Sequence, residues 1–301
     1  MTSSGDAFRC GYVAIVGEPN VGKSTLLNAI LEEKLSIVTS KPQTTRQRVL
    51  GILNHPDSQI VFLDTPGLIN PRYLLQTEMM HHARSAAIDA DVILVLTDVA
   101  KSSSVLTMLG DILTQNSEKP ILLAINKVDT IFKPELLPMM EKFSQLGMFR
   151  EIIPISALKK QNTDDLLRTI HKYLPLNEPL YPTDIISEQP EKFFVAEFIR
   201  EKIFLDFHDE IPYSTAVEIV EFTERTEGKT LIRADIIVER DSQKGMLIGK
   251  RGEALNRIGR AARRDIESFI QKEVFLELFV KVREHWRENE GILKRLGYNS
   301  E

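Results

Sequence analysis

A glycine-rich segment near the N-terminus has the residue types and spacing of a phosphate-binding loop. It fits the pattern G-x-x-x-x-G-K-[ST] with Gly17, Glu18, Pro19, Asn20, Val21, Gly22, Lys23 and Ser24, and Thr25 follows. Its glycines let backbone N–H groups approach phosphate oxygens, and the N-terminus of a following helix adds positive potential. Lys23 is expected to reach the β- and γ-phosphates and to support catalysis, and the Ser24 hydroxyl is expected to bind Mg²⁺.

A second motif, N-K-x-D, favours guanine over adenine. It is formed by Asn126, Lys127 and Asp129 directly after an apolar run. The Asp129 carboxylate can accept hydrogen bonds from the guanine N1–H and 2-amino groups, whereas adenine would leave it unpaired. Asn126 is expected to fix the loop and the N7 side of the base, and the Lys127 stem is expected to cover the base plane. Ser156 and Ala157, after the last apolar run, are expected to contact guanine through backbone groups.

A third polar loop closes another apolar run and consists of Asp64, Thr65, Pro66 and Gly67. Asp64 is expected to hold a Mg²⁺-bound water, and the Gly67 N–H is expected to touch the γ-phosphate, so that the loop senses hydrolysis. Between this loop and the first one, residues 39–46 are polar and lack periodicity. One of their threonines can complete the Mg²⁺ shell only when the γ-phosphate is present, and Thr45 is favoured over Thr44, with a catalytic contribution.

The elements that position these loops are predicted to form a parallel sheet. Short apolar runs alternate with helix-like stretches such as Thr25–Leu31, which is typical of βαβ units. The runs are Tyr12–Val16, Gln59–Leu63, Val92–Leu96, Ile121–Ile125 and Ile152–Ile155. Each run ends in polar or turn-forming residues, and the carboxyl ends of parallel strands form a ligand crevice in such folds.

The pattern changes after a proline-rich stretch, Pro175–Pro190, which indicates a linker between two domains. Beyond it the sequence predicts an α+β domain. A helix is expected over 193–207 and a long helix after Gly252, and the predicted strands are Ser214–Thr223, Lys229–Val238 and Val274–Val282. The turn between the first two of these strands is expected at 224–229, with Gly228.

A basic, glycine-flanked loop lies in this second domain. It contains Ile248, Gly249, Lys250, Arg251 and Gly252. On the helix that follows, Arg257, Arg260 and Arg264 share a face, while the opposite side is apolar with Leu255, Ile258, Ala262 and Ile266. The helix can therefore pack inward and present positive charge to a phosphate backbone. A merely solvated basic face, or one that binds anionic lipid, remains an alternative.

Composition narrows the class of protein. The chain has 301 residues, a formal net charge of −5 and 43% hydrophobic residues, which suits an ordinary folded protein of about two domains. The single cysteine, Cys10, excludes an intramolecular disulfide and a cysteine-cluster zinc site. Apolar runs are too short for a membrane-spanning helix, and the N-terminus lacks a signal-peptide core, so a cytoplasmic protein is expected.

Together the loops resemble the translation-factor-like family of GTP-binding proteins over residues 11–175. Asn20 and the pair Thr44-Thr45 resemble a subset in which a potassium ion bridges the phosphates. Leu68 stands where Ras-like enzymes have the glutamine that orients the attacking water. The resemblance therefore implies slow intrinsic, Mg²⁺-dependent hydrolysis of GTP to GDP and phosphate, assisted by Lys23 and possible K⁺ at Asn20.

The basic loop resembles the GxxG loop of a KH domain, which holds single-stranded nucleic acid. The whole chain resembles the Era family of bacterial ribosome-assembly GTPases. This implies an α/β P-loop GTPase domain with a mixed, mostly parallel sheet (8–175), a linker (176–190) and an α+β type II KH domain (191–301). It further implies a monomeric switch that binds the 3′ end region of 16S ribosomal RNA, assists 30S subunit assembly and associates peripherally with the inner membrane.

Three other classes of protein are considered. A tRNA-modifying GTPase of the same superfamily would carry an additional domain and a C-terminal cysteine, and a tandem GTPase would carry a second phosphate loop; the sequence has none of these features. A membrane-surface signalling protein could use the same basic helix. The GxxG loop, however, has no evident purpose in lipid binding.

Overall fold

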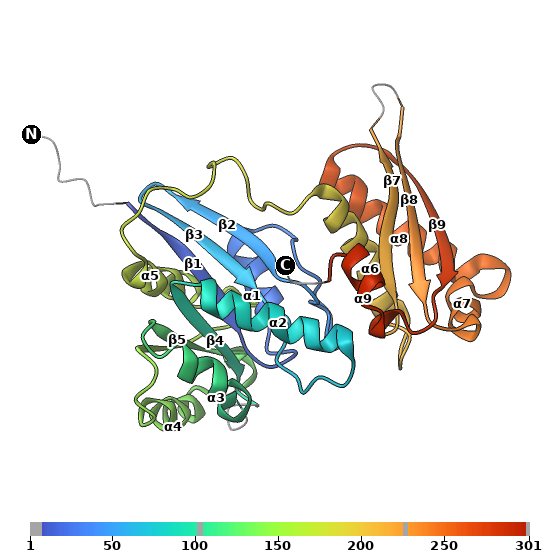
Figure 1. Cartoon of the computed structure of the whole chain (residues 1–301). Helices are drawn as coiled ribbons and strands as arrows, with labels where there is room; N and C mark the ends of the chain where they lie inside the picture. The colour runs from blue at the N-terminus through green and yellow to red at the C-terminus, as the bar shows by residue number, and fades with distance from the viewer. Residues whose placement is uncertain (1–7, 101–104, 225–227, 299–301) are drawn as a thin grey trace, which may run out of the picture. The chain divides into compact units, whose positions relative to one another are not determined.

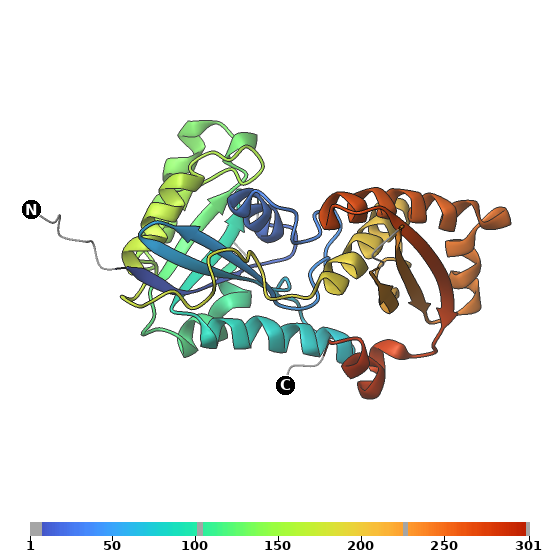
Figure 2. The ribbon, with the colours of Figure 1, turned by 90° about the horizontal axis from the view of Figure 1, so that it is seen from above.

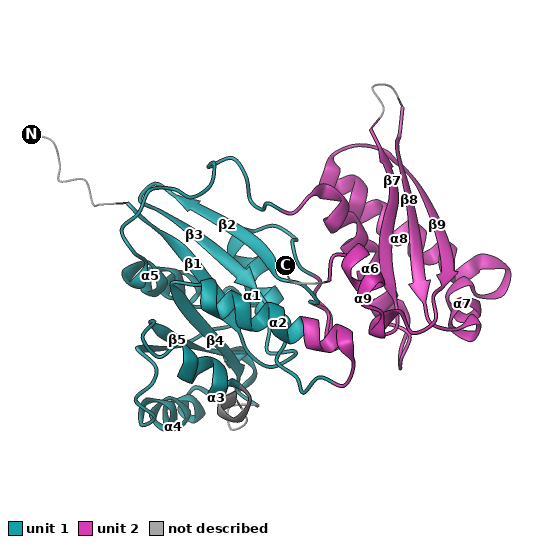
Figure 3. Cartoon of the chain, viewed as in Figure 1, with its two compact units in different colours: residues 1–36, 45–71, 79–188 teal, residues 37–44, 72–78, 189–301 magenta. Residues whose placement is uncertain are grey.

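Two separate sheets organise the chain in a computed structural model, which describes residues 8–100, 105–224 and 228–298 (Figure 1). Unit 1 takes in residues up to 36, 45–71 and 79–188, and unit 2 takes in 37–44, 72–78 and the chain from 189 onward (Figure 3). The segment 176–190, predicted as a linker, thus belongs to unit 1 as far as Glu188. Two short segments from within the first half of the chain belong to unit 2.

Unit 1 contains a six-stranded sheet in the order β2-β3-β1-β4-β5-β6. Its strands are β1 (Arg9–Val16), β2 (Val49–His55), β3 (Ser58–Asp64), β4 (Val92–Asp98), β5 (Ile121–Asn126) and β6 (Glu151–Pro154). Only β2 runs antiparallel to its neighbour, β3, and the other pairs are parallel. The five predicted runs are all strands, displaced by a few residues at their ends.

Helices cover both faces of this sheet. They are α1 (Lys23–Leu31), α2 (Leu74–Asp89), α3 (Val105–Gln115), α4 (Lys133–Ser144) and α5 (Thr163–Tyr173), with a short 3₁₀ turn, η1 (Val128–Thr130). In Figures 1 and 2, α1 and α5 lie on one face of the sheet and α2 and α3 on the other. Every residue of β3, β4 and β5 is buried, because both of their faces are covered.

Unit 2 has a three-stranded sheet, β7-β8-β9, in which β7 and β8 are antiparallel and β8 and β9 are parallel. Its elements in chain order are α6 (Glu191–Asp206), β7 (Ala216–Thr223), β8 (Thr230–Val238), α7 (Asp241–Ile248), η2 (Lys250–Gly252), α8 (Glu253–Ile270), β9 (Val274–Val282), η3 (Trp286–Glu288) and α9 (Glu290–Arg295). The predicted order of helices and strands is confirmed. The inward face of α8 carries Ile258, Ala262 and Ile266, all buried.

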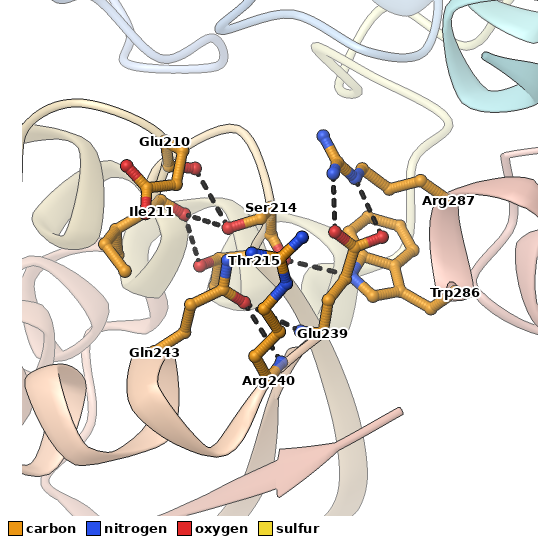
Figure 4. Close-up of polar contacts among 9 residues, drawn as sticks. All are labelled: Glu210, Ile211, Ser214, Thr215, Glu239, Arg240, Gln243, Trp286 and Arg287. Carbon is orange, nitrogen blue, oxygen red and sulfur yellow. Dashed lines mark hydrogen bonds and ion pairs between the residues drawn. The ribbon is translucent and has the colours of Figure 1, made fainter. Parts of the chain in front are cut away.

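A buried polar cluster fixes the C-terminal end of unit 2 (Figure 4). The Trp286 indole N–H donates to the Ser214 carbonyl at 2.9 Å, and the Ser214 hydroxyl donates to the Glu210 carbonyl. The Thr215 hydroxyl donates to the Ile211 carbonyl, residues 211–214 form a turn, and β7 begins only at Ala216. The predicted turn at 224–229 includes 225–227, which lie outside the described residues. Within the described ranges, no helix is long and apolar enough to cross a bilayer.

Candidate functional site

The phosphate loop joins β1 to α1 and is closely packed. Gly22 has φ = 100°, a left-handed conformation that favours glycine, and a Cβ at this position would lie 2.4 Å from Asn126 Nδ2. The Lys23 ammonium is buried and donates to the carbonyls of Gly17 at 3.1 Å and Glu18 at 2.9 Å. The cation is therefore held over the loop, within reach of anions that the loop would bind.

Asn126, the last residue of β5, joins two loops. Its Nδ2 donates to the Val21 carbonyl at 2.8 Å, and its Oδ1 accepts from the Ala157 N–H at 2.9 Å. The side chain is 3% exposed. Asn126 thus fixes the phosphate loop to the loop after β6.

Lys127 makes a second link to the phosphate loop. Its Nζ donates to the Asn20 carbonyl at 2.7 Å and pairs with Asp98 Oδ2 at 2.8 Å. Asp98 was not predicted as a site residue, although it ends β4 beside Asn126 in the sheet, at the edge where the other predicted site residues lie. Asp98 orients the Lys127 stem.

The remaining residues of the predicted guanine site lie on neighbouring loops. Asp129 is exposed within η1, on the turn that follows Asn126. Ser156 is fully buried, and its Oγ accepts a hydrogen bond from the Lys159 N–H at 3.1 Å. The Val128 N–H donates to the Ile155 carbonyl at 3.2 Å, which holds the two loops together.

Three oxygen-bearing side chains converge beside the phosphate loop. Ser24 Oγ lies 2.8 Å from Asp64 Oδ2 and 2.9 Å from Thr45 Oγ1. Asp64 is fully buried, and its Oδ1 makes no hydrogen bond of normal geometry within the described residues. Burial raises the pKa of Asp64, and the Lys23 cation acts in the opposite direction. Hard oxygen donors around a buried, incompletely satisfied carboxylate fit a magnesium ion.

The loop after β3 touches the phosphate loop directly. A Cβ at Gly67 would lie 2.8 Å from both Cα and N of Pro19, so only glycine fits. The Leu68 N–H donates to the Gly17 carbonyl at 3.1 Å, and the Leu68 side chain is buried. The buried leucine offers no hydrogen-bonding group to a water molecule.

The second candidate site is the loop between α7 and α8. Gly249 has φ = 71° and Gly252 has φ = 80°, both in the region that favours glycine. A Cβ at Gly249 would lie 2.8 Å from the Ala254 Cβ, whereas Lys250 and Arg251 between the glycines are exposed. The loop therefore brings its backbone to the surface and surrounds it with positive charge, and Ile248 precedes it at the end of α7.

A groove of about 180 Å³ adjoins this loop, between α8 and β9. Its lining residues are Leu255, Asn256, Gly259, Arg260, Arg263, Leu276 and Leu278. The leucines supply apolar contacts and the arginines supply positive charge, a combination suited to a base stacked near its phosphate. Of this set, Arg260 alone was predicted from the sequence as a site residue. The period-2 pattern of β9 places Leu276 and Leu278 on one face and was the signal for these two leucines.

The three predicted RNA-binding arginines of α8 differ in their surroundings. Arg257 makes a bidentate ion pair with Asp206, with Nε 3.0 Å from each carboxylate oxygen. Arg260 lines the groove and donates to the Asn256 carbonyl, and Arg264 is exposed. The charge of Arg257 is thus partly neutralised by its own chain.

Comparison with known proteins identifies the families of both domains. A family model described as a 50S ribosome-binding GTPase matches residues 12–127, and a KH domain model matches residues 210–287. The GTPase Era of Geotalea uraniireducens is 48% identical over 292 residues, which cover 97% of this chain and 98% of that protein. The chain belongs to the Era family of GTPases.

Solved Era structures share the fold over nearly the whole chain. Aquifex aeolicus Era bound to GDP.AlF4⁻ is 39% identical with a TM-score of 0.94, covering 97% of this chain and 100% of that one. Era in complex with MgGDPNP and nucleotides 1506–1542 of 16S ribosomal RNA is 40% identical with a TM-score of 0.91 and the same coverage. The predicted fold, a P-loop GTPase domain followed by a KH domain, is confirmed.

Proposed function

We propose that this Era-family GTPase is a switch that binds the 3′ end region of 16S ribosomal RNA through its KH domain and assists 30S subunit assembly. The observation that carries the proposal is the likeness, over 97% of the chain, to an Era structure that holds that RNA and MgGDPNP. The proposed domain limits are 8–175 for the GTPase, 176–190 for the linker and 191–301 for the KH domain.

For the nucleotide, each loop is given one role. The phosphate loop binds the phosphates, with Lys23 neutralising charge that develops on the β- and γ-phosphate oxygens. Asp129 reads guanine, and Asn126 keeps the base and phosphate loops in register. The loop at Asp64–Gly67 reports the γ-phosphate, because the close approach of Gly67 to Pro19 brings its N–H beside the phosphate loop.

We assign the magnesium site to Ser24, Thr45 and, through water, Asp64, since these oxygens converge beside the phosphate loop. Bound there, Mg²⁺ neutralises charge on the β- and γ-phosphates. The geometry favours Thr45 over Thr44, because Thr45 Oγ1 is the one beside Ser24. The chain has buried Leu68 in place of a water-orienting glutamine, so slow intrinsic hydrolysis is expected.

Potassium is proposed as a second ion near Asn20. This residue is exposed at the rim of the phosphate loop and has a left-handed backbone, φ = 66°. An amide oxygen at that position can add a ligand to a K⁺ ion that offsets phosphate charge. Single-turnover hydrolysis is expected to be faster in potassium than in sodium buffer, and equal rates would contradict this part of the proposal.

For RNA, the GxxG loop holds the backbone and the groove beside α8 receives bases. Lys250, Arg251 and Arg260 supply the charge that opposes the phosphates, and Arg264 extends it along the helix. Arg257 is already paired with Asp206 and is expected to contribute less. The leucines beside the arginines of the groove favour unstacked bases over a duplex.

The test is crosslinking of bound RNA in cells followed by sequencing. Wild type is compared with a double variant, Gly249→Asp with Gly252→Asp, which puts two carboxylates where phosphates must approach. A matched control is Gly291→Asp, in the first turn of α9, because no residue of α9 lines the groove and an acid suits a helix N-terminus. Reads at the 3′ end of 16S RNA should disappear only in the double variant. Scattered reads that are indifferent to it would refute the RNA assignment.

We further propose a monomer in the cytoplasm with peripheral association with the inner membrane, as the family resemblance implies. The exposed basic residues of the KH domain support a contact with anionic headgroups. Flotation with anionic vesicles, with and without competing RNA, distinguishes the two partners of this surface. Recovery in the vesicle fraction only when RNA is absent would mean that both use the same residues.

A further inference from the structure

Two segments that adjoin the nucleotide loops belong to unit 2, which also contains the KH domain and is called the KH unit below. Residues 37–44 precede the proposed magnesium ligand Thr45, and residues 72–78 follow the loop at Asp64–Gly67 (Figure 3). Along the chain, the boundary between the two units falls at the Thr44–Thr45 peptide bond. Contacts that residues 37–44 make with the rest of unit 2 can therefore act on Thr45 through a single peptide.

The strongest of these contacts comes from Arg200, in the middle of α6. Its guanidinium is 1% exposed, and its Nη2 donates to the Thr44 carbonyl. Nε of Arg200 also donates to Glu197 Oε1 at 2.8 Å, and the two charges form an ion pair. Burial lowers the pKa of Arg200, but the Glu197 carboxylate raises it and the net direction is upward, so the cation persists.

The hydrogen bonding of Arg200 is incomplete. Its Nη1 is buried and has no hydrogen-bond partner among the described residues. A buried charge with an unmet donor contributes poorly to stability, and an uncharged side chain of similar size would avoid the desolvation cost. The presence of an arginine here is better explained by the carbonyl that it holds than by the packing of α6.

Lys41 attaches the same segment to the end of the same helix. Its Nζ donates to the carbonyls of Phe204 and Phe207, where α6 ends. A cation at a helix C-terminus is favoured by the helix dipole and by the unpaired carbonyls. Residues 37–44 are thus held at two points on α6, with Thr44 at one of them.

The second segment, 72–78, is joined to this arrangement. Gln76 Nε2 donates to Gln43 Oε1 at 3.2 Å, and its Oε1 accepts from the Arg72 N–H at 2.9 Å. The Arg287 guanidinium lies 4.6 Å from the centroid of the Tyr73 ring. Arg287 also donates from Nε to Glu239 Oε1 at 3.0 Å (Figure 4). Within unit 2, each segment therefore contacts an arginine that a carboxylate orients, Arg200 for residues 37–44 and Arg287 for residues 72–78.

We propose that Arg200 is a positioning residue for the GTP-bound state, because it holds the Thr44–Thr45 peptide in the orientation that presents Thr45 to the magnesium site. The peptide is planar, so fixing the Thr44 carbonyl also fixes the N–H side from which Thr45 begins. The inference rests on the proposed nucleotide site. It adds that the contact between Arg200 on α6 and the Thr44 carbonyl depends on whether Thr45 binds the magnesium ion. By linkage, RNA binding and GTP binding then affect each other through this contact.

The test measures nucleotide affinity of the full chain with fluorescent GDP and a non-hydrolysable GTP analogue. In Arg200→Met, affinity for the GTP analogue with Mg²⁺ should fall about tenfold, whereas GDP affinity should change less than twofold. The GTP-specific loss should disappear in EDTA, because Thr45 then has no ion to bind. Arg200→Lys keeps the charge but loses the planar fork of N–H donors. Its affinity for the GTP analogue should lie between those of the wild type and Arg200→Met.

Lys202→Met is the matched control. Lys202 is a half-buried cation on α6 that pairs with Glu201 at 2.8 Å and with Asp265 at 2.5 Å, and these partners lie outside 37–44. It should leave the GTP-to-GDP affinity ratio unchanged. Should Arg200→Met fail to fold, Lys41→Met serves instead, because its target carbonyls can bind water; a GTP-specific loss of about threefold is expected.

A second measurement tests the link to RNA. The ratio of RNA affinities with the GTP analogue and with GDP should move toward one in Arg200→Met. Equal losses for GDP and GTP, a loss that persists in EDTA, or an unchanged RNA ratio would each overturn the inference. A wild-type chain that bound no guanine nucleotide would instead refute the proposed function, so the two failures are distinguishable.

Discussion

Replacing Asn126 with alanine should weaken the binding of GDP and GTP to the same extent. The side chain makes two buried hydrogen bonds, one to the Val21 carbonyl at 2.8 Å and one from the Ala157 N–H at 2.9 Å. Val21 is 0% and Ala157 1% exposed, so both backbone groups would lose their partners in a buried place. Neither bond involves residues 39–46 or the loop at Asp64–Gly67, which are the segments proposed to respond to the γ-phosphate. The loss of affinity should therefore be the same for GDP and GTP.

The magnitude follows from the number of groups left unpaired. Each buried backbone group without a partner costs about 1–3 kcal/mol. Water can enter from the exposed side of Asn20, so the lower end of the range applies and the two groups together cost about 2–3 kcal/mol. Without the Asn126 side chain the two loops are no longer joined to each other, so the nucleotide must order them when it binds and most of this cost is expected to fall on binding. It corresponds to about 30- to 150-fold weaker affinity, at tenfold for each 1.4 kcal/mol.

The assay is stopped-flow binding of fluorescent GDP and a GTP analogue, and the change is expected mainly in the dissociation rate. Thr130→Ala is the control, because the Thr130 hydroxyl makes an exposed hydrogen bond of 2.7 Å to the Lys127 carbonyl that water can replace. It should change affinity less than twofold. A loss in Asn126→Ala confined to GTP, or a loss below threefold for both nucleotides, would refute the account of Asn126 as a fixed link between loops.

Three further outcomes are expected. Gly259→Leu should reduce RNA affinity at least tenfold without changing GTP affinity, because the leucine side chain would fill the groove. The fold should tolerate the change, since the added Cβ would meet only Leu278 Cδ1, at 3.4 Å. Fluorescence anisotropy with a labelled oligonucleotide of the 16S 3′ end measures the RNA affinity. Arg260→Ala should weaken the same binding about three- to tenfold and reduce its salt dependence, whereas Arg257→Ala, already paired with Asp206, should change it less than twofold. Cys10 is 0% exposed, and burial also raises the pKa of its thiol, so maleimide labelling at pH 7.5 should be much slower in the folded chain than in denaturant.

The sequence was most informative where chemistry is local. The phosphate loop, the N-K-x-D motif and the GxxG loop are each read within a few residues, because glycine conformations and a helix N-terminus are properties of a short segment. Strand periodicity likewise identified five strands of the GTPase sheet. One strand was missed: β2 pairs antiparallel with β3 across a tight connection at 56–57. Pro56-Asp57 between two apolar runs was a hairpin signal in that sequence.

The contacts that join the loops could not be predicted from the sequence. Asn126 and Val21 are 105 residues apart, and Arg200 and Thr44 are 156 residues apart. Which side chain reaches which carbonyl depends on packing of elements that share no sequence pattern. Arg257 illustrates the same limit, because its place on the basic face of α8 follows from helical spacing, but its pairing with Asp206 depends on where α6 ends.

The contacts of the nucleotide loops fall into two kinds. The difference explains how one chain can bind guanine nucleotide firmly and still respond to the presence of the γ-phosphate. Asn126 and Lys127 tie the base and phosphate loops together within the GTPase unit, so they act in every nucleotide state. Thr45 stands at the edge of that unit, and the residue before it is held by Arg200 from the KH unit. Loss of a contact of the first kind should lower all affinities together, whereas loss of the second should change only the difference between GTP and GDP. The comparison of Asn126→Ala with Arg200→Met therefore separates holding the nucleotide from reporting its state.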